Sequence, residues 1–391
     1  MAARYAKISG WGHYVPSRVV TNKDLAKTLD TSDEAIYALS GIRERRLVSP
    51  GESTSHMAIA ASQEALEKAR VDARDLGLII VATSSPDYLT PSVASQVQHA
   101  LGAKGVPAFG LSAGCAGFVY ALATAQQFIV CGSYDNVLVV GAEVIGRFMD
   151  WTDRSTCILF GDGAGAAVLQ VSDKPGGVLG YALASDGSAA DHIIMPAGGA
   201  AAPSTHETVD KGLHYVQMKG SQVMTFSNRV LGKAMLQALQ QAGIKAKDLD
   251  LFVPHQANVR IIRRMARQLG IPKEKVFVNI DRFGNTSTAS IPIAVSEAIE
   301  QGRAKVGDKL GFTALGAGLA WGAAVIEVGE PDQPIAVQRA RLARPAWLSL
   351  DPFRAVARTT SANVIKPLLV AGAVLGAWFR RMAKRKRDSD G

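Results

Sequence analysis

Cysteine is scarce in this sequence. The 391 residues include three Cys, at positions 115, 131 and 157, an odd number without the spacing of metal ligands. This usage argues against a disulfide framework and a structural metal site, and it favours a reduced, cytoplasmic setting. The first residues also lack the apolar core of a secretory signal peptide. We therefore expect a cytoplasmic protein without a bound metal.

Long apolar runs are missing as well. Residues 367–379 are uncharged and mostly apolar, but these thirteen residues fall short of the ~20 that a membrane-spanning helix needs. Six Lys or Arg follow between 380 and 387. An apolar segment with a polybasic flank can bind weakly to an anionic membrane surface. We therefore interpret 362–387 as a membrane-associating segment for the inner face of the membrane, with a disordered tail or a docking helix as open alternatives.

Basic residues outnumber acidic residues mainly at the C-terminal end of the chain. The formal net charge is +9. Residues 331–391 contain twelve Lys or Arg and four Asp, whereas residues 1–330 contain 31 basic and 30 acidic residues. The body is thus nearly neutral, and the positive charge belongs to a tail. This distribution argues against nucleic acid as a partner.

The body contains an internal repeat. Residues 65–78 align without gaps on residues 238–251, and seven of the fourteen positions are identical. Residues 165–171 recur in a similar way as 322–328. Each copy of the longer repeat has the pattern of a helix, a turn and a buried strand. Such alternation is typical of α/β sheets that helices cover on both faces.

The two repeats set the expected domain boundaries. Chance similarity between Ala-rich helices is the alternative explanation. Two repeated segments in the same order favour duplication of an ancestral half. We predict an N-terminal half at 1–174, a C-terminal half at 175–329 and a tail at 330–391. Both halves are expected to be α/β and to pack about a pseudo-twofold axis.

Cys115 has the surroundings of a nucleophile. It lies between Gly114 and Gly117, after an apolar run at 107–111 and before a helix-like stretch at 118–130. The start of a helix lowers the pKa of a nearby thiol, and the glycines permit a tight turn and close approach of a substrate. A buried structural thiol is the alternative, and we apply that interpretation to the other two cysteines.

His255 and Asn285 are the polar residues expected to serve this thiol. His255 follows the strand of the second repeat copy, at the end where α/β sheets usually carry functional groups. Asn285 lies in a loop before a helix, where an Asn can also be a simple helix cap. A single thiol with a His and an Asn elsewhere in the chain is typical of cysteine-based acyl transfer. The two polar side chains can then donate to one oxygen.

The order of several short motifs makes the resemblance to one family specific. The motifs are TSDE at 31–34, GIRER at 41–45, AGCAGF at 113–118, FGDGAG at 160–165, HQAN at 255–258 and GNTS at 284–287. Over residues 5–328 the chain resembles the β-ketoacyl-acyl-carrier-protein synthase III family. The resemblance implies a thiolase-like fold with αβαβα layers. It also implies an acyltransferase, the condensing enzyme that initiates fatty-acid synthesis.

The resemblance implies roles for the site residues. Cys115 is expected to accept an acyl group from a thioester, an acyl-CoA in this family, before malonyl-acyl-carrier protein loses CO2 and attacks that group. His255 and Asn285 are expected to stabilise the enolate. The backbone N–H of Cys115 and the loop at Ala317 and Gly318 are expected to form an oxyanion hole. No cofactor is implied beyond the thioester substrates, and a homodimer is expected.

Binding positions follow from the same resemblance. The carrier-protein-binding segment corresponds to five consecutive residues: Gln256, Ala257, Asn258, Val259 and Arg260. Arg154 and Arg260 match positions that contact coenzyme A, and Thr90 matches a position of the acyl pocket.

Further Arg residues extend this basic segment. Arg260, Arg263, Arg264 and Arg267 have the spacing of one helical face. Such a face suits an acidic carrier protein, and a solvated charged face is the alternative for Arg264 and Arg267.

Two positions depart from the family pattern. Ala35 replaces a Trp that stacks on the adenine of coenzyme A, and Leu39 replaces an Arg. These changes leave open a specialised condensing enzyme of secondary metabolism with an unusual acyl donor. A non-catalytic, membrane-tethered scaffold of the same fold is a further alternative. The intact set of Cys115, His255 and Asn285 argues against the scaffold.

Overall fold

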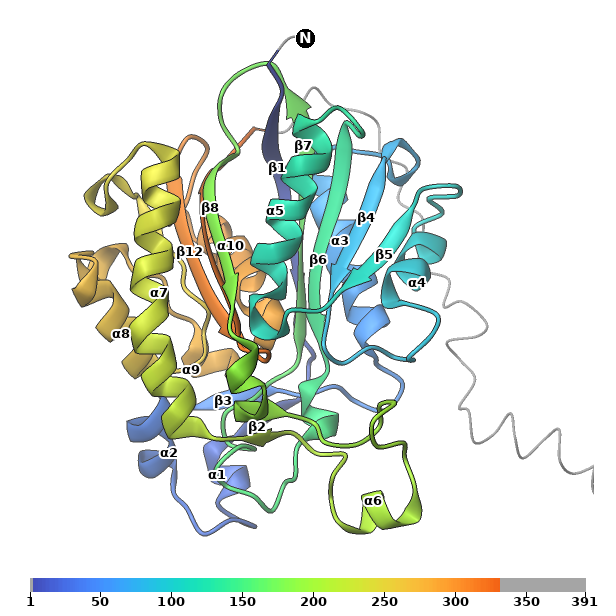
Figure 1. Cartoon of the computed structure of the whole chain (residues 1–391), viewed down its shortest axis with the longest axis vertical. Coiled ribbons are helices and arrows are strands. Elements are labelled where there is room, and N and C mark those ends of the chain that lie inside the picture. Colours follow the sequence, from blue (N-terminus) through green and yellow to red (C-terminus); the bar gives the residue numbers. More distant parts are fainter. Residues whose placement is uncertain (1–2, 331–391) are drawn as a thin grey trace, which may run out of the picture. The chain divides into compact units, whose positions relative to one another are not determined.

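The computed structural model describes residues 3–330 of the chain. Within these residues, a pair of large β-sheets lies among layers of helices (Figure 1). Apart from Glu330, the expected tail lies outside the described residues, and so does the expected membrane-associating segment at 362–387. None of the helices within residues 3–330 is long and apolar enough to cross a membrane.

The first sheet has five strands in the order β1-β7-β6-β4-β5. They are β1 (Tyr5–Tyr14), β4 (Leu78–Ala82), β5 (Ala108–Leu111), β6 (Asn136–Glu143) and β7 (Gly163–Ser172). β4 is parallel to β5 and β6, whereas β7 is antiparallel to β1 and β6. β4 is apolar throughout because helices cover both of its faces.

The second sheet has four strands in the order β11-β12-β13-β8. They are β8 (Val178–Ser185), β11 (Leu251–Phe252), β12 (Lys309–Gly316) and β13 (Ala320–Glu327). β11 is parallel to β12, and the other pairs are antiparallel. Two small ribbons pair β2 (Val19–Thr21) with β3 (Glu44–Arg46) and β9 (Ile193–Ile194) with β10 (Gln217–Met218).

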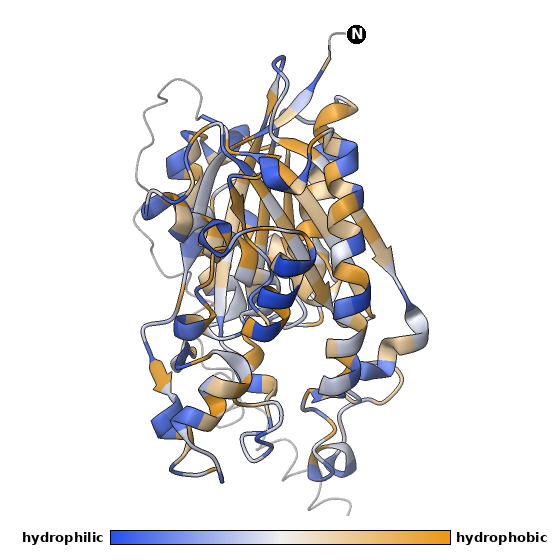
Figure 2. Ribbon diagram, turned by 90° about the vertical axis from the view of Figure 1, so that its left-hand side faces the viewer, coloured by the Kyte–Doolittle hydropathy of each residue, from blue (hydrophilic) through white to orange (hydrophobic). Residues whose placement is uncertain are grey.

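The α-helices of the described residues differ in length and in burial. They are α1 (Asn22–Leu25), α2 (Asp33–Ser40), α3 (Thr54–Ala69), α4 (Val93–Ala100), α5 (Gly117–Val130), α6 (His206–Asp210), α7 (Gly220–Ala242), α8 (Val259–Gln268), α9 (Ile280–Phe283) and α10 (Ser290–Glu300). In α7, the buried residues Val230, Ala234 and Ala238 recur with the helical period. Figure 2 shows apolar residues concentrated on the strands and polar residues on the outer helices.

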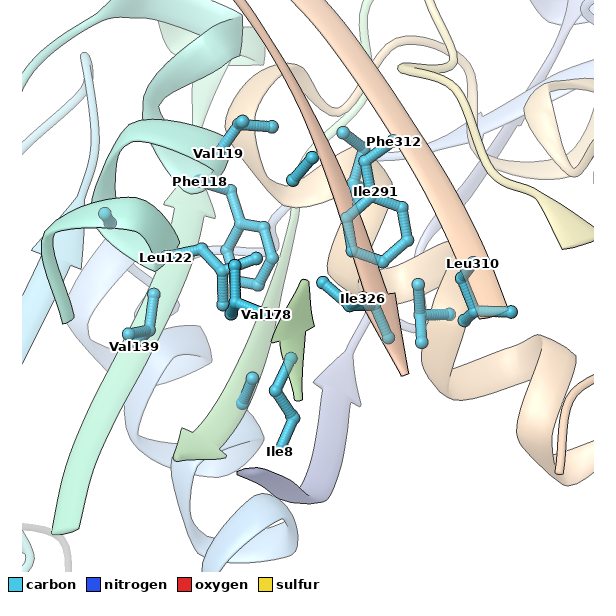
Figure 3. Packing of buried hydrophobic residues seen from close by; sticks show 14 of the residues in the cluster. Ile8, Phe118, Val119, Leu122, Val139, Val178, Ile291, Leu310, Phe312 and Ile326 are labelled. Carbon is cyan, nitrogen blue, oxygen red and sulfur yellow. The ribbon is translucent and has the colours of Figure 1, made fainter. Parts of the chain in front are cut away.

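The layers follow from the shared cores. Phe118 and Leu122 of α5 and Ile291 of α10 pack in one cluster with Ile8 of the first sheet and Phe312 of the second (Figure 3). α5 and α10 therefore lie between the sheets. α3 and α4 cover the other face of the first sheet, and α7 and α8 cover the other face of the second. The predicted αβαβα thiolase-like fold is confirmed.

The sequence repeat corresponds to equivalent contacts in the two halves. α3 leads through a 3-10 turn to β4, and α7 leads through another to β11. A Cβ atom at Gly10 of β1 would overlap the carbonyl oxygen of Ala65, and one at Gly180 of β8 would overlap that of Ala238. Ala65 and Ala238 occupy the same position of the repeat. Small residues on both sides thus let each helix lie directly on its strand.

The predicted boundary between the halves, at 174/175, falls between the two sheets. β7 of the first sheet ends at Ser172, and β8 of the second sheet begins at Val178. Residues 3–330 nevertheless belong to one compact unit. The division into two domains at this position therefore stays a prediction.

Candidate active site

Cys115 lies in the turn that connects β5 to α5. A short 3-10 helix contains the Cys, and α5 begins two residues later. Gly114 has φ +54°, and a Cβ atom there would overlap the backbone nitrogen of Ala317. A Cβ atom at Gly316 would in turn overlap the backbone nitrogen of Cys115. The glycines therefore let the Cys115 turn and the loop after β12 pack backbone against backbone.

His255 is held through both its backbone and its ring. Its backbone N–H donates to the carbonyl oxygen of Thr313 over 2.7 Å, and its Nδ1 lies 2.6 Å from the Ser290 hydroxyl. That hydroxyl also accepts the backbone N–H of Gln256 over 3.4 Å, so its own hydrogen is free for Nδ1. Burial lowers the pKa of His255 to about 4. The imidazole is therefore neutral at pH 7.

Asn285 is oriented by its own loop. Its Oδ1 accepts the backbone N–H of Ser287 over 2.8 Å, which leaves the amide N–H groups as the donors of the side chain. The Asn285 backbone pairs with a neighbouring segment, donating to Leu159 over 2.8 Å and accepting from Gly161 over 3.0 Å. The FGDGAG motif and the residue before it therefore hold the GNTS motif in place through backbone pairing.

These residues meet at one cavity of about 520 Å³. Cys115, His255, Asn285 and Ala317 all line it, so the residues predicted from three distant motifs are brought together. Most of the remaining wall is apolar and includes four methionines: Met195, Met218, Met224 and Met265. Methionine side chains adapt to flexible apolar ligands. The cavity can hold an acyl or pantetheine chain beside the thiol.

The pKa of the Cys115 thiol shifts in the direction opposite to the predicted one. The start of α5 was predicted to lower it, but burial of the thiol raises the pKa of Cys115 to about 12. A hydrogen bond from Ser287 acts in the opposite direction, and the negative charge of Glu143 adds to the rise. Loss of water around the thiolate is the largest cause of this rise.

The sequence reasoning missed Ser287 and Glu143. The Ser287 Oγ lies 3.3 Å from the Cys115 Sγ and 3.2 Å from the Glu143 Oε1. Glu143 is fully buried at the end of β6, and burial raises its pKa to about 7. An acidic residue directly after an apolar strand is a signal that could have drawn attention to Glu143, because sheet ends carry functional groups.

The segment expected to bind carrier protein divides into an inner and an outer region. Gln256 is 1% exposed, and its amide bonds to Pro254, Phe277 and Asn279 inside the protein. It therefore supports the segment rather than presenting a surface. Asn258 caps α8 by accepting the backbone N–H of the exposed Arg260. Ala257 and Val259 are half-buried between them.

The basic residues of α8 lie together. Arg260, Arg263, Arg264 and Arg267 line one groove of about 390 Å³. All four are exposed, as their helical spacing predicted. This groove adjoins the main cavity at Arg260, which lines both.

The other predicted binding residues lie on the surface. Arg154 is exposed and donates to the backbone carbonyl of Asp30. Ala35 is exposed on α2, and Leu39, 46% exposed, lines the cavity. Thr90 is also exposed, and it is not among the residues that line this cavity. Within one chain, the structure therefore does not bring Thr90 to the thiol.

Comparison with known proteins places this geometry in a family. A family model for 3-oxoacyl-[acyl-carrier-protein] synthase III matches residues 109–187, and the model for its C-terminal region matches 239–328. The chain is 47% identical over 322 residues to a β-ketoacyl-[acyl-carrier-protein] synthase III of Caldanaerobacter subterraneus, covering 82% of this chain and 97% of the relative.

Solved structures agree with the sequence comparison. A 3-oxoacyl-[acyl-carrier-protein] synthase III from Aquifex aeolicus has a TM-score of 0.76 and 45% identity, covering 82% of this chain and 99% of its own. The priming β-ketosynthase of the R1128 polyketide pathway has a TM-score of 0.78 and 35% identity, covering 84% and 98%.

Proposed function

The chain belongs to the 3-oxoacyl-[acyl-carrier-protein] synthase III family, and we propose that Cys115, His255 and Asn285 divide its reaction between them. The protein is an acyltransferase, a condensing enzyme that initiates fatty-acid synthesis. One observation carries the assignment of roles. The thiol, the neutral imidazole and the Asn amide line the same cavity.

In the first step, the sulfur of Cys115 attacks the carbonyl carbon of an acyl-CoA. The bond to the coenzyme A sulfur breaks, and the acyl group stays on Cys115. The intermediate carries an oxyanion, for which the backbone N–H of Cys115 and the loop at Ala317 and Gly318 supply the donors. The close packing at Gly114 and Gly316 supports this assignment, because it fixes one segment against the other.

In the second step, malonyl-acyl-carrier protein loses CO2 and its enolate carbon attacks the acyl-Cys. Negative charge develops on the thioester oxygen of the malonyl group. The neutral His255 can donate its Nε2–H to this oxygen, and Asn285 can add a second donor from its amide. A preorganised donor of this kind typically contributes ~10²–10³ in rate. Neither residue needs to exchange a proton.

The carrier protein and coenzyme A are proposed to approach over α8. The groove lined by four Arg residues gives this side a positive charge that suits an acidic carrier protein and a phosphate chain. Arg260 belongs to both the groove and the cavity, which supports a role at the entrance. Arg154 is the second proposed contact for coenzyme A, on the exposed surface.

A homodimer is proposed to form through the edge of the first sheet. β5 is the last strand of that sheet, and its Phe109 is 37% exposed. Tyr88 and Leu89, which directly precede Thr90, are 50% and 87% exposed. An apolar edge strand with exposed aromatic and aliphatic side chains favours pairing with another strand. Thr90 would then reach a partner chain rather than its own cavity.

An unusual acyl donor is the second candidate for the first step. Two observations favour it: the exposed Ala35 and Leu39 at the coenzyme A side, and the likeness to a polyketide priming synthase. The condensation itself is the same in both cases. The difference lies in which thioester acylates Cys115.

One experiment tests the assignment of the nucleophile and the identity of the acyl donor. Purified full-length protein is incubated with a series of acyl-CoAs of increasing length, with and without malonyl-acyl-carrier protein. Intact-protein and peptide mass spectrometry then identify the acylated residue, and product masses identify the condensed chain. We expect one adduct on the Cys115 peptide that disappears when the malonyl substrate is added. In Cys115→Ser, a thioester adduct on a peptide that does not contain residue 115 would refute the nucleophile assignment.

A further inference from the structure

A chain of side-chain contacts leads from the thiol to a buried carboxyl group. The Ser287 Oγ lies 3.3 Å from the Cys115 Sγ and 3.2 Å from the Glu143 Oε1. Glu143 accepts further hydrogen bonds from the Ser84 backbone and the Ser85 hydroxyl. These contacts join the C-terminal half to the nucleophile of the N-terminal half. The two-step reaction described above does not use them.

The backbone of Ser287 supports a specific role for its hydroxyl. Ser287 has φ +51°, a left-handed conformation that is uncommon for residues other than glycine. The bond from its N–H to the Asn285 Oδ1 holds this conformation. Such strain is found mostly where the surrounding structure fixes a functional side chain. In this site, the conformation is found in a residue whose hydroxyl lies between the Cys115 thiol and the Glu143 carboxylate.

We propose that Ser287 and Glu143 form a proton path that accepts the proton of the Cys115 thiol during acylation and returns it after condensation. The inference rests on the proposed role of Cys115 as the acylated nucleophile. Ser287 touches the reacting sulfur, and Glu143 acts through Ser287. The path keeps the net charge of the site constant, because a thiolate appears as the carboxylate is neutralised.

The proton and electron balance of the path is simple. The thiol hydrogen passes to the Ser287 oxygen, and the hydroxyl hydrogen passes to Glu143. The sulfur attacks the acyl carbonyl, and the departing thiolate of coenzyme A keeps the electron pair of the broken bond and takes a proton from solvent. When the enolate attacks the acyl-Cys, the bond from carbonyl carbon to sulfur breaks. The Cys115 thiolate then takes back the proton held by Glu143.

The surroundings of Glu143 suit this exchange. Burial raises its pKa to about 7, so the carboxylate can accept a proton near neutral pH. The titratable side chains around the path are the Cys115 thiol and, across the cavity, the neutral His255. Asp162 precedes the β7 residue that pairs with Glu143, but its carboxylate is bound by backbone N–H groups of Val48 and Gly146.

The Glu143→Gln variant separates a proton path from a simple charge effect. If Glu143 acted only through its negative charge, which raises the pKa of Cys115, the neutral Gln would make the thiol more reactive. A proton path in which Glu143 takes up the thiol proton as the sulfur attacks predicts the opposite, because Gln cannot accept that proton. We expect alkylation of Cys115 by iodoacetamide, in which the sulfur attacks and the thiol proton is lost without an acyl donor, to slow at least ~10-fold at pH 7.5. An unchanged or faster rate would overturn the proposal.

The chain carries its own reference for this measurement. Cys131 is exposed, and a hydrogen bond from Ser133 lowers its pKa, so it also reacts with iodoacetamide. Peptide mass spectrometry reports both cysteines in one sample. The rate at Cys131 is expected to be the same in wild type and Glu143→Gln.

Two variants of Ser287 separate the hydroxyl from the backbone. Ser287→Ala and Ser287→Gly both remove the oxygen, but Gly tolerates φ +51° without strain. We expect the two variants to lose Cys115 reactivity equally, whatever their difference in thermal stability. Normal reactivity in Ser287→Gly would show that the residue matters only for the local backbone and would overturn the path.

The pH profile identifies which carboxyl group is involved. We expect the alkylation rate of wild-type Cys115 to show an inflection near pH 7 that Glu143→Gln loses and Asp162→Asn keeps. The opposite pattern would assign the inflection to Asp162 and contradict the proposal. These readings need no acyl-CoA. If no acyl donor labels Cys115, that result contradicts the proposed function. The alkylation result still tests the proton path, because alkylation does not depend on an acyl donor.

Discussion

The two halves of the molecule share a scaffold but not a chemistry. In each half a helix, a 3-10 turn and a parallel strand follow in the same order, and a glycine on another strand of the same sheet packs against an Ala of that helix. The N-terminal half supplies Cys115 and Glu143, groups that can carry negative charge. The C-terminal half supplies His255, Asn285 and Ser287, which donate hydrogen bonds.

The difference shows what burial does to each kind of group. It raises the pKa of Glu143 to about 7 and that of Cys115 to about 12, and it lowers the pKa of His255 to about 4. All three shifts favour the neutral form. The Cys115 thiol and the His255 imidazole are therefore neutral at rest, and fixed dipoles meet the charge that develops on substrate oxygens during the reaction.

The sharpest test of this division is to inactivate each half separately. Cys115→Ser is expected to abolish the acyl-enzyme. His255→Ala is expected to keep acylation but to slow CO2 release from malonyl-acyl-carrier protein ~10²–10³-fold, because one donor to the enolate is lost. Single-turnover mass spectrometry and a CO2 assay measure the two steps. Near-normal condensation in His255→Ala would contradict the separation of roles.

Stability should depend on pH with opposite signs in the two halves. The pKa of Glu143 is raised from 4.5 to about 7, so the free energy of unfolding should fall as pH rises from 4.5 to 7. The pKa of His255 is lowered from 6.5 to about 4, so the free energy of unfolding should fall as pH drops from 6.5 to 4. Each change is on the order of 3 kcal/mol.

Urea titrations between pH 4.5 and 7.5 can check these opposite slopes. Glu143→Gln should reduce the decline toward neutral pH and leave the part due to Asp162, whose pKa burial raises to about 6. His255→Gln should reduce the decline toward acid. If both variants altered the same side of the profile, the assignment of at least one pKa would be wrong.

The repeated helix–strand contacts can be compared directly. Gly10→Ala and Gly180→Ala each introduce a Cβ atom that overlaps a helix carbonyl, so each is expected to lower the free energy of unfolding by about 1–3 kcal/mol. Gly187→Ala, where a Cβ atom meets nothing within 4 Å, is the control and should stay within about 0.5 kcal/mol of wild type. A large loss in only one of the first two would show that the halves are not packed equivalently.

The smallest effect is expected at the coenzyme A entrance. Ala35→Trp adds an aromatic side chain at an exposed position of α2 and should strengthen binding of the adenine by ~1 kcal/mol. The Michaelis constant for acyl-CoA should then fall about fivefold, with no change in that for malonyl-acyl-carrier protein. An equal effect on both substrates would mean that the residue alters the shared cavity instead.

The sequence supported prediction of the features that depend on short motifs and periodicity. The apolar period and the 65–78 repeat predicted the layered α/β fold, and the glycines around Cys115 identified the turn next to α5. The same signals did not predict the Ser287–Glu143 contact, because its partners are 144 residues apart and the strand-end position of Glu143 does not indicate which side chain it contacts. The pKa of Cys115 was predicted in the wrong direction because burial depends on residues from the second half.

The orientation of the Thr90 and Gln256 side chains could not be predicted from the sequence either. A motif match gives a position in a family, but it does not say whether a side chain points outward, as the exposed Thr90 does, or into the protein, as Gln256 does. Those outcomes depend on how loops pack, which requires the tertiary structure.

The position of the site residues next to the central helices α5 and α10 determines how the enzyme should lose activity on heating. Cys115 lies directly before α5, and Ser287 and Ser290 lie at the start of α10, while the bodies of both helices form the core between the sheets. A mobile surface loop could open on its own, but these residues cannot separate without disrupting that core. Thermal inactivation should therefore coincide with cooperative unfolding of the whole body, with little loss of activity at lower temperatures.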